Sequence, residues 1–330
     1  MIDIERARVL ITGGAGFIGS ALAWGLNTRG SSRIVIADRL GTTAKWRNLR
    51  GLRFEDYLEA DDLLDRLAHD RLGEFDLVLH MGACSATTEQ DASYLARNNY
   101  EFSKDLCRWA MQHGAAFVYA SSAATYGDGS AGMVDDPTTI EPLRPLNMYG
   151  YSKLLFDRWV RDHELLPRVA GLRFFNVFGP NEGHKGEMRS VVHKAYAQVR
   201  DEGRVRLFRS HHPDYRDGEQ RRDFVYVKDV VEMTLHLAAH GSRGIFNIGS
   251  GEARTWLDLV RPIFAAAGVP ERIEFIDMPE ALRGTYQYHT QADISRLRAA
   301  GYTRPPTPLA DAVGEYVSTY LAAGRHLGDE

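Results

Sequence analysis

A tyrosine and a lysine one helical turn apart are the residues whose spacing points most directly to chemistry. Tyr149 and Lys153 lie in the run Tyr-Gly-Tyr-Ser-Lys, and a helix would place both side chains on one face. A tyrosine hydroxyl has an ordinary pKa of about 10 and is a poor base at neutral pH. A neighbouring ammonium, helped by a positive nicotinamide ring, favours the phenolate and brings that pKa toward the working range. The pair therefore predicts proton transfer by Tyr149.

Hydroxyl side chains precede this pair in the chain. The segment 121–126 reads Ser-Ser-Ala-Ala-Thr-Tyr and follows an apolar run expected to be a strand. A hydroxyl at the end of that strand can hydrogen-bond the oxygen at which a reaction occurs. Tyrosine and lysine at this spacing also occur in purely structural helices, so the interpretation depends on a cofactor signal elsewhere.

That signal is a glycine-rich loop near the N-terminus. Gly13, Gly16 and Gly19 stand between an expected strand and an expected helix. They allow a tight turn, a close backbone approach to a pyrophosphate, and close packing of the helix on the strand. The N–H groups at the start of the helix face the phosphates. The loop therefore predicts dinucleotide binding.

The residues at the end of the next strand leave the type of dinucleotide open. Asp38 can accept hydrogen bonds from a ribose 2′-hydroxyl, which favours NAD. Arg39 and Lys45 follow on the same loop, and two cations there can neutralise a 2′-phosphate, which favours NADP.

Elements that alternate along the first half of the chain must position these residues. We expect strands at 8–12, 33–37, 76–80, 116–121 and 169–175. We expect helices at 17–29 and 147–163, and a helical stretch that follows the strand 76–80 and reaches about residue 111. The alternation predicts an α/β fold with a Rossmann-like, doubly wound parallel sheet. We expect a dinucleotide-binding Rossmann domain at 1–175, with a return segment near 222–240. The remainder, 176–330, is expected to be a smaller C-terminal substrate domain, with helices at 256–267 and 309–322.

The combined motifs resemble the extended short-chain dehydrogenase/reductase family. Finer matches run over nearly the whole chain and are to nucleotide-sugar epimerases of that family that act on ADP-heptose. The most specific pieces read Gly-Ala-Cys-Ser at 82–85 and Gly-His-Lys-Gly at 183–186. Further matching stretches lie at 119–126, 146–153, 174–180, 222–227 and 290–293.

The resemblance implies an isomerase with a bound NADP that is not consumed, although NAD stays possible. The reaction would pass through a transient ketone at C6″ of the heptose, in the synthesis of lipopolysaccharide core precursors. Tyr149 and Lys185 would be the two acid/base groups. Lys153 would hold the nicotinamide ribose and tune Tyr149, and Ser122 would bind the reacting oxygen.

The resemblance also implies contact residues. Those for the cofactor are Phe17, Ile18, Met81, Gly82, Ala83, Cys84, Ser85, Asn98, Tyr149, Lys153, Val177 and Lys185, in addition to the glycines, Asp38, Arg39 and Lys45. Those for the sugar nucleotide are Asn176, Glu187, Lys194, Phe208, Arg222 and Tyr286. An arginine suits a diphosphate because its fork pairs with two phosphate oxygens at once.

Some positions depart from the family pattern. Ala60 replaces an expected lysine near the cofactor, Glu187 a small serine, and Lys194 a histidine. The segment 210–220 looks like an insertion beside the nucleotide pocket. These departures leave the chemistry intact and leave the sugar and the nucleotide open.

Three other functions also use a glycine loop of this kind. A 4,6-dehydratase of this family carries Asp-Glu after its active-site hydroxyl residue, but Ala123 and Ala124 stand here and cannot transfer protons. A UDP-hexose 4-epimerase remains an alternative, which would leave the Gly-His-Lys-Gly match unexplained. A non-enzymatic sensor of the dinucleotide would have lost the catalytic tyrosine, which this chain retains.

The composition of the chain limits the classes of binding partner that we expect. The chain has 44 acidic and 40 basic residues, so neither nucleic acid nor an anionic membrane is an expected partner. Its two cysteines are too few for a disulfide framework, and His211-His212 lacks further ligands for a metal. We expect a cytoplasmic protein without a signal peptide. The resemblance implies a homo-oligomer, with a pentamer as the suggested size.

Overall fold

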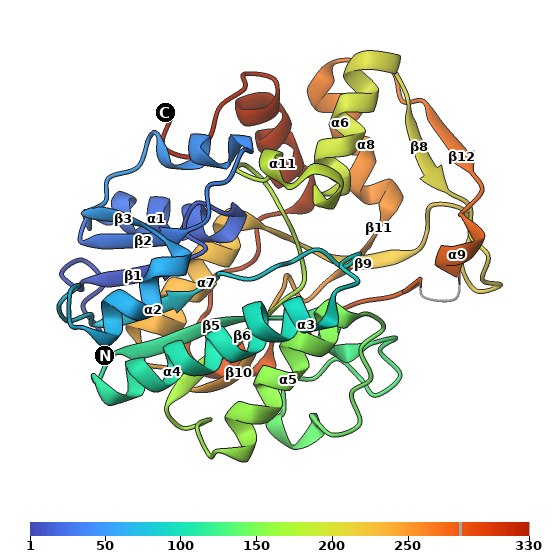
Figure 1. Ribbon diagram of the computed structural model, residues 1–330. Coiled ribbons are helices and arrows are strands. Elements are labelled where there is room, and N and C mark those ends of the chain that lie inside the picture. Colours follow the sequence, from blue (N-terminus) through green and yellow to red (C-terminus); the bar gives the residue numbers. More distant parts are fainter. Residues whose placement is uncertain (284–285, 330) are drawn as a thin grey trace.

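A seven-stranded parallel sheet lies at the centre of the computed structural model, which describes residues 1–283 and 286–329 (Figure 1). The strand order is β10-β6-β5-β4-β1-β2-β3, so the order reverses between β1 and β4. Most of these strands are short, fully buried apolar runs, as expected for a parallel sheet covered on both faces. Their bounds are β1 Val9–Thr12, β2 Ile34–Asp38, β3 Asp56–Glu59, β4 Leu77–His80, β5 Ala116–Ser122, β6 Val169–Phe174 and β10 Gly244–Ile248.

Helices cover both faces of this sheet and bury two hydrophobic cores. On one face lie α1 (Phe17–Thr28) and α7 (Val227–Ala239), which pack against each other. On the other face lie α2 (Ala60–Ala68), α4 (Phe102–Gln112) and α5 (Met148–Asp162), which contribute apolar side chains to the second core. The fold is thus α/β with a Rossmann-like, doubly wound sheet, as predicted.

Shorter elements make up the part of the molecule that carries α6 and α8 (Figure 1). A three-stranded sheet holds β7 (Asn176–Phe178), β9 (Arg221–Tyr226) and β11 (Ala253–Thr255), and β8 (Val205–Phe208) pairs with β12 (Ile273–Ile276). The helices there are α6 Val191–Glu202, α8 Trp256–Ala267, α9 Glu280–Arg283 and α11 Leu309–Glu315, whereas α10 Ser295–Ala299 packs against β10 of the large sheet. A 3₁₀ helix, η1 (Ala44–Leu49), follows β2, and another, η5 (Gly183–Met188), follows β7.

The structure differs from the sequence expectations in three places. The strand β3 was not expected, because its run is half polar and partly exposed. The expected return segment near 222–240 contributes α7, which packs against α1 on the large sheet, but its strand β9 pairs outside that sheet, and β10, from beyond the segment, joins the sheet. The helices expected up to 111 and over 309–322 each contain a π-helical stretch, Ala96–Glu101 and Tyr316–Leu321. Within the described residues no helix is long and apolar enough to cross a membrane.

Candidate active site

The glycine loop lies where the strand order reverses, the place where open α/β sheets bind ligands. Gly13 has a φ of +66°, and a Cβ there would come within 2.7 Å of the Gly82 backbone. A Cβ on Gly19 would lie 2.1 Å from the Gly13 carbonyl oxygen. Only glycine permits these approaches, which bring the ends of β1 and β4 together beneath the start of α1. A cavity of about 750 Å³ lies next to the glycine loop, and Gly13, Gly19 and Gly82 are among the residues that line it.

Charged residues at the end of β2 line the same cavity. The Asp38 carboxylate accepts hydrogen bonds from the Ala15 backbone N–H at 2.9 Å and from the Lys45 ammonium at 2.8 Å. The Arg39 guanidinium pairs with Asp61 and donates to the Asn98 side chain at 2.8 Å. Two cations therefore stand at the place where a cofactor ribose is expected, and one of them neutralises Asp38.

The Gly-Ala-Cys-Ser segment follows β4 and is held by a residue that the sequence analysis missed. Asn99 is 1% exposed and lies in the π-helical stretch Ala96–Glu101. Its side chain bonds both the N–H and the carbonyl of Cys84, each at 2.9 Å, and donates to the Ser152 hydroxyl at 3.0 Å. Such π-bulges are frequent at functional sites. Asn99 fixes the cavity wall to the helix that bears Tyr149.

The start of α5 sets the position of Tyr149. The Asn147 side chain accepts from the Gly150 N–H at 2.8 Å and caps the helix. A Cβ on Gly150 would meet the Ala124 carbonyl oxygen at 2.7 Å, so glycine lets α5 approach the end of β5. Burial raises the pKa of Tyr149, and a hydrogen bond with Ser122 partly opposes that rise. Burial in this pocket therefore acts against the lowered pKa expected from the sequence.

Lys153 lies under the cavity on the same face of α5. Its ammonium is buried and donates to the Ala120 carbonyl oxygen at 2.9 Å. Burial lowers the pKa of Lys153 to about 8, and the carboxylate of Asp157 opposes this change.

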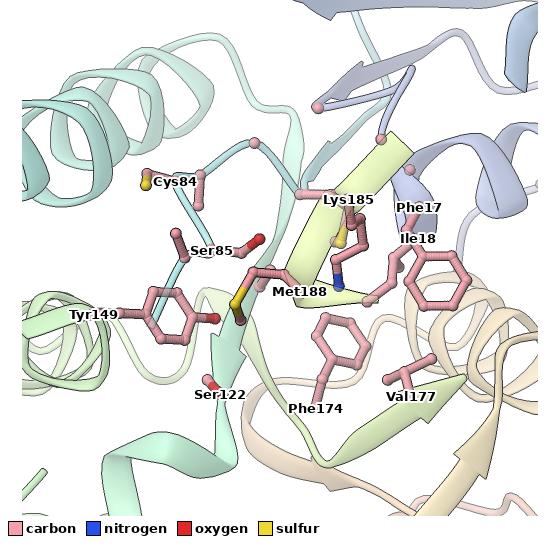
Figure 2. Close-up of a pocket in the computed structure, with 18 of the residues that line it drawn as sticks. Phe17, Ile18, Cys84, Ser85, Ser122, Tyr149, Phe174, Val177, Lys185 and Met188 are labelled. Carbon is pink, nitrogen blue, oxygen red and sulfur yellow. The ribbon is translucent and has the colours of Figure 1, made fainter. Parts of the chain in front are cut away.

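Lys185 enters the cavity from a different element. It lies on η5, and Figure 2 shows its side chain and that of Tyr149 reaching into the same pocket from separate parts of the chain. Its ammonium stands 5.3 Å from the centroid of the Phe17 ring. Burial lowers the pKa of Lys185, and the nearby Glu182 carboxylate opposes that shift.

Most residues expected to contact the sugar nucleotide do not line this cavity, unlike those expected to contact the cofactor. Asn176 lines the cavity, beside Val177. Lys194 pairs at 3.7 Å with Glu187, whose side chain is 93% exposed. Neither of these two lines the cavity, and nor do Phe208, Arg222 and Tyr286.

Arg222 nevertheless borders the cavity through an aromatic neighbour. Its guanidinium stands 5.7 Å from the Trp256 ring centroid and 5.1 Å from that of Tyr286. Trp256 itself lines the cavity and donates to the Tyr286 hydroxyl at 2.9 Å. Arg222 is 6% exposed, and its guanidinium donates to the Arg221 carbonyl at 2.8 Å; within the described residues it pairs with no carboxylate. A buried cation without a counter-charge is suited to an anionic ligand.

A family model matches most of the chain, over residues 9–249, and its description is the NAD dependent epimerase/dehydratase family. The chain belongs to this family. As a member of it, the chain has alanines at 123 and 124, immediately after Ser122, where acid and base groups for dehydration are expected.

Relatives within the epimerase/dehydratase family are similar over nearly their full length. The ADP-L-glycero-D-manno-heptose-6-epimerase of Nitratidesulfovibrio vulgaris strain Hildenborough is 55% identical, covering 95% of this chain and 98% of its own. The enzyme of that name from Fusobacterium nucleatum is 44% identical, covering 95% and 98%.

Solved structures of epimerases share the fold. That of the Helicobacter pylori ADP-L-glycero-D-manno-heptose-6-epimerase has a TM-score of 0.81 and 30% identity, covering 97% of this chain and 99% of its own. That of the Thermus thermophilus UDP-glucose 4-epimerase in complex with NAD has a TM-score of 0.75 and 27% identity, covering 96% and 99%.

Several cavity residues of this epimerase/dehydratase family member were not foreseen. Phe174 ends β6, and the rule that ligands bind at the carboxyl ends of parallel strands could have identified it. Met188 lies beside Lys185 on η5 (Figure 2). Trp256 comes from the start of α8, and no local sequence motif predicts its place in the cavity. No group of three or more metal-ligating side chains occurs among the residues that the structure describes.

Proposed function

We propose that this chain interconverts ADP-D-glycero-D-manno-heptose and ADP-L-glycero-D-manno-heptose by inverting C6″, with NADP as the bound cofactor. The observation that carries the proposal is that Tyr149 and Lys185, from two different elements, enter one cavity beside the glycine loop. The relative at 55% identity that bears the name of this activity supports the choice of substrate.

The residues at the cavity fit a dinucleotide. The glycine loop leaves no room for side chains at Gly13 and Gly19, so a pyrophosphate could approach the backbone and meet the uncapped N–H groups at the start of α1. The ion pair of Asp38 with Lys45, with Arg39 beside it, favours a ribose 2′-phosphate and therefore NADP. When bound, the dinucleotide would accept a hydride from C6″ and return it to the opposite face.

The side chains would manage the protons and hold the substrate. Tyr149 and Lys185 would each take or give the proton of the C6″ oxygen, one for each orientation of the exocyclic group, and Ser122 would hydrogen-bond that oxygen. Lys153 would hold the nicotinamide ribose and favour the Tyr149 phenolate. Arg222 would pair with the substrate diphosphate, because its buried charge otherwise lacks a carboxylate among the described residues.

Incubation with ADP-, GDP- and UDP-sugars, followed by NMR, tests the proposal. We expect ADP-heptose alone to give an equilibrium mixture of its two C6″ epimers. Inversion of a UDP-hexose at C4 with ADP-heptose unchanged would contradict the proposal and favour the 4-epimerase alternative. A chain that binds the dinucleotide but changes no sugar would contradict both.

A further inference from the structure

In the loop 179–190, the part that carries Lys185 has little packing of its own. Its 3₁₀ helix η5 has no buried residue, and Gly186 within it has a φ of +55°. A loop of this kind cannot fix a lysine by hydrophobic burial, so anchors outside η5 must hold it. The structure supplies such anchors at the two residues that precede η5, Asn181 and Glu182.

Asn181 joins four separate segments. Its side chain donates to the Ser20 hydroxyl on α1 at 2.9 Å and accepts from the Leu327 N–H in the C-terminal tail at 2.9 Å. Its carbonyl accepts from the Asn48 side chain on η1 at 3.0 Å. Asn181 is 4% exposed and has a φ of +76°, a backbone conformation that is uncommon outside glycine and for which asparagine is enriched. A strained residue with every side-chain polar group engaged is held by the surrounding structure.

Asn48 continues the connection to the cofactor loop. The same side-chain nitrogen lies 2.9 Å from the Ala15 carbonyl in the glycine loop and 3.2 Å from Nδ1 of His184, the residue before Lys185. Asn48 is 2% exposed and lies near the end of η1, the 3₁₀ helix that carries Lys45. The loop 179–190, the glycine loop and η1 are therefore joined at the pair Asn48 and Asn181.

The C-terminal tail completes this assembly. Arg50 forms an ion pair with Asp329, and a Cβ on Gly51 would lie 2.4 Å from the Gly328 carbonyl oxygen, so the two backbones are in close contact. In Figure 1 the C-terminus accordingly lies beside the segment that follows β2. We define the C-terminal tail as residues 316–329, and it begins with the π-helical stretch Tyr316–Leu321. The Tyr316 hydroxyl donates at 3.0 Å to Glu182, whose carboxylate also accepts from the Ser190 hydroxyl at 2.6 Å.

We infer that Asn181 is a positioning residue for Lys185, and that the C-terminal tail takes part in the active site by holding Asn181 and Glu182. The inference rests on the proposed function insofar as Lys185 is taken as an acid/base group. Small displacements of such a group are costly, since a shift of about 1 Å can lower a rate about 10²-fold. Loss of these anchors would therefore affect the step that needs Lys185 and leave the dinucleotide bound.

A set of substitutions separates positioning from general stability. Asn181→Gly keeps the left-handed backbone and removes both side-chain contacts, whereas Asn181→Asp keeps an acceptor for the Leu327 N–H. Tyr316→Phe removes only one hydroxyl, so it tests the tail without a large change in shape. Glu164→Gly is the matched control, because Glu164 also has a positive φ (56°) but is exposed and does not line the cavity.

The first readout is a double-mutant cycle on kcat with the epimerised nucleotide sugar. We expect Asn181→Gly to lower kcat about 10-fold or more, Asn181→Asp and Tyr316→Phe less, and Glu164→Gly by less than about twofold. In a Lys185→Met background the effect of Asn181→Gly should nearly vanish, because both changes remove the same contribution. Equal effects in the two backgrounds would overturn the inference.

The second readout needs no substrate, so it stands even if the proposed activity fails. Modification of lysines by an amine-reactive sulfonate is followed by peptide mass spectrometry, with Lys104 on α4 as the reference. We expect Lys185 to react several-fold faster in Asn181→Gly than in the unchanged protein, while the Lys104 rate stays constant. An unchanged Lys185 rate would contradict the positioning role, and so would a rise in the rates of both lysines, which would report general unfolding.

Discussion

The two sides of the cavity are built in different ways. On the cofactor side, every residue expected to contact the dinucleotide lines one cavity, and many of these residues stand at the carboxyl ends of parallel strands or in the glycine loop. On the substrate side, five of the six expected residues lie outside the lining, on short elements that include β8 and β9. Most residues expected to contact the dinucleotide thus lie at the large sheet and the elements beside it, whereas most of those expected to contact the sugar nucleotide lie on short elements away from it. Substitutions on the two sides should therefore separate turnover from substrate affinity.

The largest expected effect is on the cofactor side, at Tyr149. Tyr149→Phe should lower kcat about 10²–10⁴-fold, the range for loss of a general acid/base, while the dissociation constant of the dinucleotide stays nearly constant. Tyr151→Phe is a matched control, because Tyr151 lies on the same helix but is 50% exposed. Unchanged turnover in Tyr149→Phe would remove this residue from the mechanism.

Lys185 should have the next largest effect, although it comes from a loop outside the large sheet. Lys185→Met should lower kcat about 10²-fold for at least one of the two epimers. Rates measured separately from each epimer, by NMR, are the test. If both epimers react at normal rates, the assignment of two acid/base groups is wrong.

On the substrate side we expect a change in KM. Arg222→Leu should raise KM for the sugar nucleotide about 10–100-fold, because charge-assisted hydrogen bonds to the diphosphate are lost, with a smaller change in kcat. Arg221→Leu, at the exposed neighbouring position, should keep a normal KM. A loss confined to kcat in Arg222→Leu would contradict the division between the two sides.

A smaller effect should distinguish the two cofactors. Lys45→Met should weaken NADP binding about 10-fold, since the cation near the 2′-phosphate is removed, and change NAD binding by less than about twofold. Fluorescence titration of each reduced dinucleotide measures both constants. An equal loss for NAD and NADP would show that Lys45 acts on Asp38 alone.

The smallest effect concerns the pH dependence of stability on the cofactor side. Burial lowers the pKa of His80, under the glycine loop, to about 3 from an ordinary value of 6.5. Between these values the unfolded chain binds a proton that the folded chain does not, so stability falls as the pH drops below 6.5. The loss from His80 is at most about 1.4 kcal/mol per pH unit.

Thermal unfolding between pH 7 and pH 5 measures this slope. We expect His80→Gln to reduce the decrease in Tm with falling pH. His212→Gln, in the exposed stretch 211–214, is the matched control and should keep the slope of the unchanged protein. Identical slopes in all three proteins would argue against a buried neutral His80.

The same division decides what the sequence could predict. Gly13 and the pair Tyr149 and Lys153 were recognisable because their roles follow from local spacing on one strand, turn or helix. Asn99 and Asn181 were not, because their partners are remote in sequence: Asn99 holds Cys84 and Asn181 holds Leu327. The place of Arg222 between Trp256 and Tyr286 likewise depends on tertiary packing that no local pattern reveals.

In the proposed reaction a hydride leaves and returns at one carbon without exchange with solvent. The most direct test is epimerisation of ADP-heptose in D₂O, with the product examined by mass spectrometry and NMR. The account predicts an inverted C6″ that carries no deuterium from the solvent. Incorporation of one solvent deuterium at C6″ per inversion would mean that a proton is removed from carbon, and would contradict it.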